Sequence, residues 1–146
     1  MIQFFVLFAL GFHTAVFAGQ FLITPEEMKA SNAAKPPFAA KAAAPKDAPL
    51  IELFVPKLTA KIISPTPIEL KFQPMPPSMV KPDTFRVLYG AFELDITNRI
   101  LSVAKVTESG VFIQEASLPK GKHKLMMVIE DTSGRRGMKA IEFEVQ

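Results

Sequence analysis

Apolar and polar side chains alternate with a period of two through the part of the chain that follows residue 50. Ile68, Leu70 and Phe72, for example, are separated by Glu69 and Lys71. Alternation of this kind is typical of antiparallel strands that have one face in a core and the other in water. It recurs in seven stretches, at residues 51–55, 67–73, 84–89, 93–97, 110–118, 122–131 and 138–145.

Turn-forming residues separate these stretches. Glycine, proline or asparagine stands between them, at residues 74–77, 90, 98, 109–110, 119–121 and 133–134. The pattern contains no helix long enough to connect parallel strands. Short strands at this spacing predict an all-β fold, a seven-stranded antiparallel β-sandwich over residues 50–146.

The first eighteen residues have the pattern of a signal peptide. Residues 2–17 contain no Lys, Arg, Asp or Glu, and Val16 and Ala18 are the small residues that a signal peptidase accepts before a cut after Ala18. No basic residue precedes the apolar stretch, so an uncleaved membrane anchor is the alternative. In either case we expect the rest of the chain to be exported, and no later stretch is apolar enough to span a bilayer.

Composition narrows the classes of function. The chain has no Cys, which excludes disulfides, thiolate metal sites and cysteine nucleophiles. A Cys-free exported protein fits a bacterial periplasm or secretion from bacteria better than a eukaryotic secretory route. The formal net charge is only +3. Nucleic-acid-binding proteins usually carry a dense stripe of Lys and Arg, so this charge argues against that class of function.

Residues 19–49 predict a short helical start followed by a linker. Thr24 can cap a helix, Pro25 suits its first position, and Glu27 stands where a capping box closes. We expect one or two helical turns, and then a flexible, disordered Ala/Pro/Lys-rich linker with almost nothing to pack. Removing the residues up to Asp47 is therefore expected to leave a folded domain at 50–146.

The last thirty residues carry the most specific pattern. Gly121, an inward ring at His123, alternating apolar residues, Asp131-Thr-Ser-Gly134 and the closing strand Ile141-Glu-Phe-Glu-Val resemble the last hairpin of bacterial immunoglobulin-like modules. In related sandwiches the inward ring is a tyrosine whose hydroxyl bonds back to the backbone. The resemblance implies structural roles for His123, Asp131 and Gly134.

A second resemblance concerns metal. The strand Pro65-Thr-Pro-Ile-Glu-Leu-Lys-Phe is similar to one in CopC-type copper-resistance proteins, which are periplasmic seven-stranded sandwiches. Their site uses an N-terminal His and an Asp-Gly-His near the last hairpin, where this chain has Gly19 and Ser133-Gly134-Arg135. The ligands are missing, so copper binding does not carry over, and copper handling remains the alternative function. Asp95-Ile-Thr-Asn-Arg99 is also similar to small secreted proteins of Gram-negative bacteria, and it supplies no activity.

Few residues suggest catalysis or metal binding. The carboxylate pairs Glu93/Asp95 and Glu130/Asp131 are better explained by a solvated strand face and a turn cap than by acid–base chemistry. His123 is the one histidine that follows the predicted signal peptide. We expect it to be a half-buried structural residue. We therefore predict no enzyme, no cofactor and no metal site.

Four methionines permit a copper(I) hypothesis, because thioethers are soft ligands. They are Met75, Met79, Met126 and Met127. Met126 and Met127 point to opposite faces of one strand. Filling gaps in a core or an interface is therefore the favoured role of these side chains.

Two small basic patches are the candidate partner contacts. Lys122 and Lys124 share one strand face, whereas Arg135 and Arg136 stand at the other end of the same hairpin. Each patch suits an anionic headgroup, a cell-wall polymer or an acidic protein, with solubility as the simpler explanation. The sequence predicts a non-enzymatic, exported immunoglobulin-like module that binds a protein or envelope polymer through a strand edge or hairpin tips.

Overall fold

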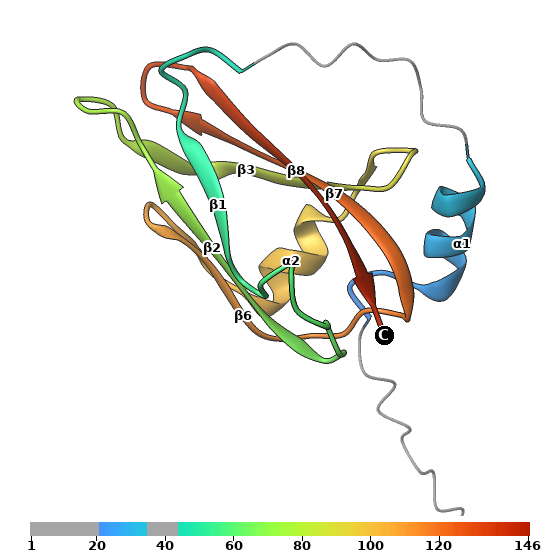
Figure 1. Ribbon diagram of the computed structural model, residues 1–146. Coiled ribbons are helices and arrows are strands. Elements are labelled where there is room, and N and C mark those ends of the chain that lie inside the picture. The colour runs from blue at the N-terminus through green and yellow to red at the C-terminus, as the bar shows by residue number, and fades with distance from the viewer. Residues whose placement is uncertain (1–20, 35–43) are drawn as a thin grey trace, which may run out of the picture.

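The computed structural model describes residues 21–34 and 44–146 (Figure 1). The predicted signal peptide and the cut after Ala18 lie outside the described residues, as do residues 35–43 of the predicted linker. The elements in chain order are α1 (Pro25–Ala33), β1 (Leu50–Val55), β2 (Thr66–Gln73), β3 (Val80–Tyr89), β4 (Leu94–Asp95), α2 (Thr97–Val103), β5 (Val106–Thr107), β6 (Gly110–Ala116), β7 (Gly121–Asp131) and β8 (Arg136–Val145).

The strands form two antiparallel sheets that pack face to face. One sheet has the order β1-β2-β6-β5 and the other β4-β3-β7-β8. The longest pairing joins β7 to β8 from Gly121↔Val145 to Glu130↔Arg136. The predicted all-β sandwich is therefore confirmed, and its arrangement is compatible with an immunoglobulin-like fold.

The predicted number of strands is wrong, because the described residues contain eight. The expected strand at 93–97 is only the two-residue β4, and the chain then turns into α2. Ile96 and Ile100 are both buried and lie four residues apart, which is the spacing of one helix face. The two-residue strand β5 follows this helix and has no alternating pattern of its own.

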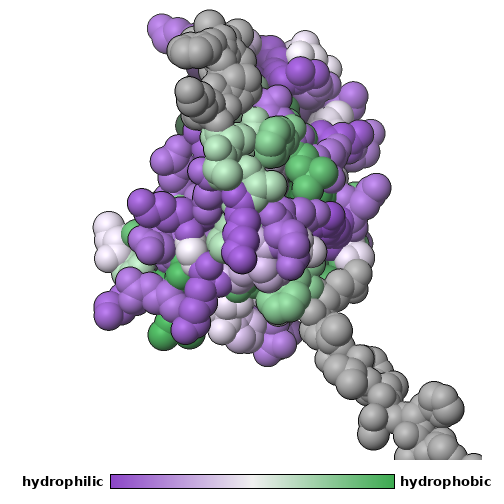
Figure 2. All heavy atoms as spheres, turned by 90° about the vertical axis from the view of Figure 1, so that its right-hand side faces the viewer, coloured by the Kyte–Doolittle hydropathy of each residue, from purple (hydrophilic) through white to green (hydrophobic). Residues whose placement is uncertain are grey.

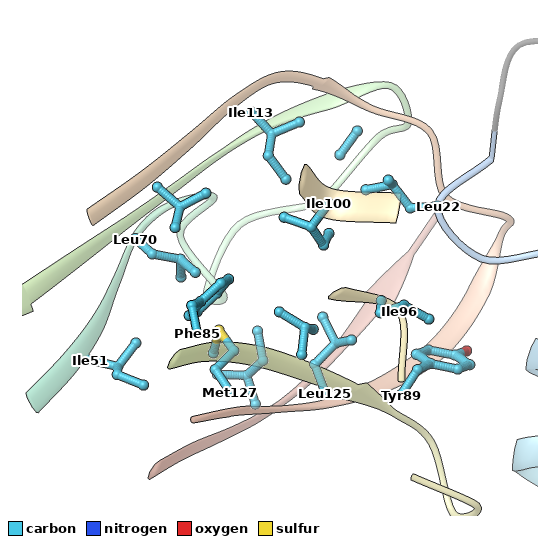
Figure 3. Close-up of a cluster of buried hydrophobic side chains, with 14 of the residues drawn as sticks. Leu22, Ile51, Leu70, Phe85, Tyr89, Ile96, Ile100, Ile113, Leu125 and Met127 are labelled. Atoms are coloured by element: carbon cyan, nitrogen blue, oxygen red, sulfur yellow. The ribbon is translucent and has the colours of Figure 1, made fainter. Parts of the chain in front are cut away.

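The core lies between the sheets and is built from the inward positions of the alternating pattern. It includes Ile51, Leu70, Phe85, Ile113 and Met127, drawn in Figure 3. An apolar cavity of about 40 Å³ remains between the sheets. It is far smaller than the roughly 150 Å³ that holds benzene in an engineered cavity, so the core has no room for an organic ligand.

The segment before α1 is part of this core, so the expectation that the chain before residue 50 has almost nothing to pack is wrong for residues 21–34. Leu22 is 4% and Ile23 1% exposed. The Leu22 N–H donates to the Ser117 carbonyl at 3.1 Å. Two apolar residues are too short a run for a periodic pattern, yet both belong to the same buried cluster as Ile96 and Tyr89, and Figure 3 shows Leu22 in that cluster.

Helix α1 begins with the predicted capping box but is longer than one or two turns. Glu27 N–H donates to Thr24 Oγ1 at 3.2 Å, and Thr24 N–H donates to Glu27 Oε2 at 2.9 Å. The helix buries none of its own residues. Its partly buried Met28 packs against the core. Polar contacts also attach it: Ala91 N–H donates to Ser31 Oγ at 3.0 Å, and Asn32 Nδ2 donates to the Lys122 carbonyl at 3.2 Å.

Neither helix of the described part has the length and apolar character needed to cross a membrane.

Candidate functional site

The β7–β8 turn engages both of the arginines that the sequence offered as partner contacts. Arg135 Nε donates to Asp131 Oδ2 at 2.8 Å, and its Nη2 donates to Ser78 Oγ at 2.9 Å. Arg136 donates to Glu130 Oε1 from Nη2 at 2.7 Å and from Nε at 3.1 Å. Both guanidinium groups therefore hold the hairpin, and Arg135 also ties it to a second loop.

Asp131 organises this turn from a fully buried position. Its Oδ1 accepts hydrogen bonds from the N–H groups of Ser133 and Arg135, each at 2.9 Å. Burial alone would raise the pKa of Asp131, but the hydrogen bonds from Arg135 and Ser133 outweigh it and keep the pKa below its usual value. Gly134 closes the turn at φ 76°, a left-handed conformation that a glycine adopts without strain.

The loop between β2 and β3 is bonded to this turn, so that the two form one end of the sandwich. Met79 N–H donates to Thr132 Oγ1 at 3.1 Å, and Thr132 N–H donates to the Met79 carbonyl at 2.8 Å. The hydroxyl groups of Ser78 and Ser133 are 2.6 Å apart. We call this surface, residues 74–79 and 132–135, the methionine end.

Two large apolar side chains stand exposed on the methionine end. Met75 is 44% and Met79 51% exposed. The other two methionines of the copper(I) hypothesis lie elsewhere: Met127 is buried in the core, and Met126 lies on β7 with its side chain on the opposite face. The four thioethers are therefore not brought together.

Lys122 and Lys124 lie at the far end of β7, beside α1. Lys124 Nζ is 3.2 Å from Glu142 Oε1, and Lys122 pairs across the ladder with Glu144. These side chains line an open groove of about 570 Å³ between the end of α1 and strands β7 and β8. Figure 2, which faces the side on which α1 lies, shows hydrophilic side chains around smaller apolar patches. Both signs of charge line the groove, so it has no marked preference for an anion.

His123 is buried, and both of its ring nitrogens are engaged. The ring is 3% exposed. Nε2 is 2.8 Å from the Pro119 carbonyl, and Nδ1 is 3.0 Å from the Tyr89 hydroxyl. Because a carbonyl only accepts, Nε2 carries the proton, and the Tyr89 hydroxyl donates to Nδ1. The ring also stacks on Phe143, with centroids 5.3 Å apart.

The titration behaviour of this pair follows from its burial. Burial lowers the pKa of His123 below 6.5, against the opposing hydrogen bond to Pro119. Burial, with a smaller contribution from the charge of Glu27, raises the pKa of Tyr89 to about 12. The neutral imidazole is thus the form that the fold favours, and neither nitrogen is free to bind a metal.

The carboxylate candidates are separated and locally bonded. Asp95 Oδ1 accepts the Thr97 N–H at 2.9 Å at the start of α2, and the hydrogen bonds from Thr97 lower the pKa of Asp95. Glu130 is paired with Arg136. Within residues 21–34 and 44–146, no three His, Asp or Glu side chains gather as a metal site.

Sequence reasoning missed the structural roles of Thr97 and Arg99, although both stand in the motif at residues 95–99. Arg99 forms a two-pronged ion pair with Glu27 and donates to the Leu22 carbonyl at 3.0 Å. Thr97 Oγ1 accepts the Val87 N–H at 2.9 Å and so fixes α2 on β3. The polar residues of the motif are therefore structural connections between α2, β3 and α1.

A scan against protein-family models found no match, and searches of curated proteins and of solved structures found none either.

Proposed function

We propose that this chain is an exported, non-enzymatic immunoglobulin-like module that binds a protein partner through the methionine end. The module is exported to the bacterial periplasm or beyond, and it carries no cofactor. The basis for export is the apolar stretch at residues 2–17 with small residues at positions 16 and 18.

The strand order supports the immunoglobulin-like assignment. Strands β1, β2, β6 and β5 follow the order A-B-E-D of such domains, and β4, β3, β7 and β8 follow the order C′-C-F-G. His123 lies near the start of the F-equivalent strand and bonds back to the carbonyl of Pro119, four residues upstream. The tyrosine of related sandwiches makes a similar bond from a similar place.

The exposed side chain of Met79 on a fixed loop is the observation that carries the proposal. A flexible thioether side chain adapts to the shape of a partner, and burying the exposed half of Met79 in an interface stabilises a complex by about 1 kcal/mol. The hydrogen bonds between the loop and Thr132 hold the Met79 backbone before any partner arrives. Binding therefore avoids much of the entropy cost of ordering a loop.

Affinity capture from an envelope extract tests this proposal with three baits. The baits are the chain from Gly19, its Met79→Asp variant and its Phe112→Asp variant, which changes a similarly exposed apolar residue (57%) on the outer face of β6. We expect a protein that the first and third baits retain and the Met79→Asp bait loses. Identical proteins on all three baits would contradict binding at the methionine end, and thermal melts establish that the variants are folded.

A further inference from the structure

Three segments meet at the end of the sandwich opposite the methionine end. The segment that begins at Phe21 is bonded to the β6–β7 loop through the Leu22 N–H and the Ser117 carbonyl. The loop between β1 and β2 joins them, because Leu118 N–H donates to Ser64 Oγ at 2.9 Å. The carboxyl terminus lies at this same end (Figure 1).

This end combines exposed apolar side chains with lysines. Ile63 is 67%, Phe21 47% and Leu58 45% exposed. Residues 56–65 and 117–120 contain three lysines and no Asp or Glu. The lysines, all exposed, are Lys57, Lys61 and Lys120. Apolar side chains surrounded by Lys are the pattern of proteins that lie in the headgroup region of a membrane.

The position of this end along the chain points to the same kind of surface. Only Gly19 and Gln20 stand between the predicted signal peptide and Phe21. Two residues span at most about 7 Å. Leu22 and Ile23 are fixed in the core. If the apolar stretch at residues 2–17 is still in the membrane when the domain has folded, this end of the domain is therefore held against the bilayer.

We propose that this end of the sandwich, with Phe21, Leu58, Ile63, Lys61 and Lys120, docks on an anionic lipid surface. The apolar side chains enter the headgroup layer, and the ammonium groups lie beside lipid phosphates. The methionine end then faces away from the bilayer, because the two ends lie on opposite sides of the molecule (Figure 1). This inference does not depend on a protein binding at the methionine end.

The apolar side chains contribute more than the charges to this docking. Two acidic groups flank the three segments, Glu26 and Glu115, and they lower the net positive charge. Glu27 is neutralised by Arg99. The lysines therefore select an anionic surface over a neutral one, and the burial of Ile63 and Phe21 supplies most of the affinity.

Vesicle flotation tests the proposal with the chain from Gly19 to Gln146, which retains every described residue. One set of vesicles contains phosphatidylglycerol and phosphatidylethanolamine, and the other contains phosphatidylcholine alone. The variants are Ile63→Ser, Phe21→Ser and Lys61→Glu. The matched controls are Phe112→Ser, on the outer face of β6, and Lys81→Glu, on β3.

We expect the chain to float with the anionic vesicles and to float distinctly less with the neutral ones. Ile63→Ser and Phe21→Ser should each weaken the partition about tenfold, which is the effect of losing part of one buried apolar side chain. Lys61→Glu should weaken it less, and both controls should leave it unchanged. The proposal is overturned by equal flotation with both vesicle types, by no flotation, or by losses as large in the controls.

Discussion

Glu27 and Arg99 stand 72 residues apart and form a two-pronged ion pair, with Arg99 Nη1 2.7 Å from Glu27 Oε2 and Nη2 2.7 Å from Oε1. The same guanidinium donates to the Leu22 carbonyl. One side chain of α2 therefore holds both the start of α1 and the apolar residues before it. This contact makes residues 21–34 part of the folded domain.

Removing residues 1–47 should strongly destabilise the sandwich. The truncation takes Leu22 and Ile23 out of the core, at a cost of about 1.5–3 kcal/mol for each side chain. That is a large share of the usual 5–15 kcal/mol of a domain. Thermal and denaturant melts measure the change, with the chain from Gly19 as the control. Melting temperatures that agree within a few degrees would restore the boundary expected from the sequence, at residue 50.

Glu27→Gln should remove a part of the stability that depends on pH. Hydrogen bonds from Arg99, helped by Thr24, lower the pKa of Glu27 from 4.5 to about 2, against the opposing effect of its partial burial. Because the folded pKa is below the unfolded one, this stability is complete above pH 4.5 and is lost as the pH falls toward 2. Water reaches both side chains, so we expect about 1 kcal/mol at neutral pH.

Denaturant melts at a series of pH values measure this difference. Glu26→Gln, in the same helical turn but without the contact to Arg99, is the matched control and should lose less stability at pH 7 than Glu27→Gln. A Glu27→Gln variant as stable as the unchanged chain at pH 7 would show that the ion pair contributes nothing to stability.

His123→Ala should cost on the order of 1–3 kcal/mol through lost packing and lost hydrogen bonds. His123→Tyr should cost less, because a phenol ring fills the same space. Burial places the pKa of His123 below 6.5, so the fold disfavours its protonated form and stability falls as the pH drops below 6.5. Melts of the two variants should lack this dependence. If the unchanged chain and His123→Tyr vary alike from pH 7 to 5, His123 is not the group that titrates.

Added copper or zinc should leave the melting temperature unchanged. The imidazole of His123 is bonded at both nitrogens, and the methionine end offers only the thioethers of Met75 and Met79. Soft copper(I) sites need about three ligands of this kind. Calorimetry checks the expectation. Stoichiometric, sub-micromolar binding that Met79→Leu or His123→Ala abolishes would favour the copper-handling alternative.

The sequence predicted the parts of the fold that depend on local periodicity. Strands such as β7 were recognised because their inward residues recur at every second position. The segment at Leu22 and Ile23 was missed because two apolar residues show no period. Helix α2 was missed because Ile96 belongs to the alternating stretch 93–97, whereas its helical partner Ile100 lies beyond that stretch.

The candidate site depended on contacts between distant residues, which a local pattern does not contain. The Asp131-Thr-Ser-Gly134 turn was recognisable because Asp and Gly each have a local role in a turn: Asp accepts backbone N–H groups, and Gly adopts the left-handed conformation. The sequence does not show that Arg135 is engaged, because its second partner, Ser78, is 57 residues away. Met79 is bonded to Thr132, which is 53 residues away, so no local pattern marks this end of the sandwich.

The central claim, that the methionine end binds a protein, is tested most directly by photo-crosslinking in cells that export the chain. A photoreactive residue replaces Met79 in one variant and Phe112 in the other, at positions of similar exposure. We predict a discrete protein adduct from position 79 and none from position 112. The same adduct from both positions, or none from position 79 while the chain is exported and folded, would contradict the claim.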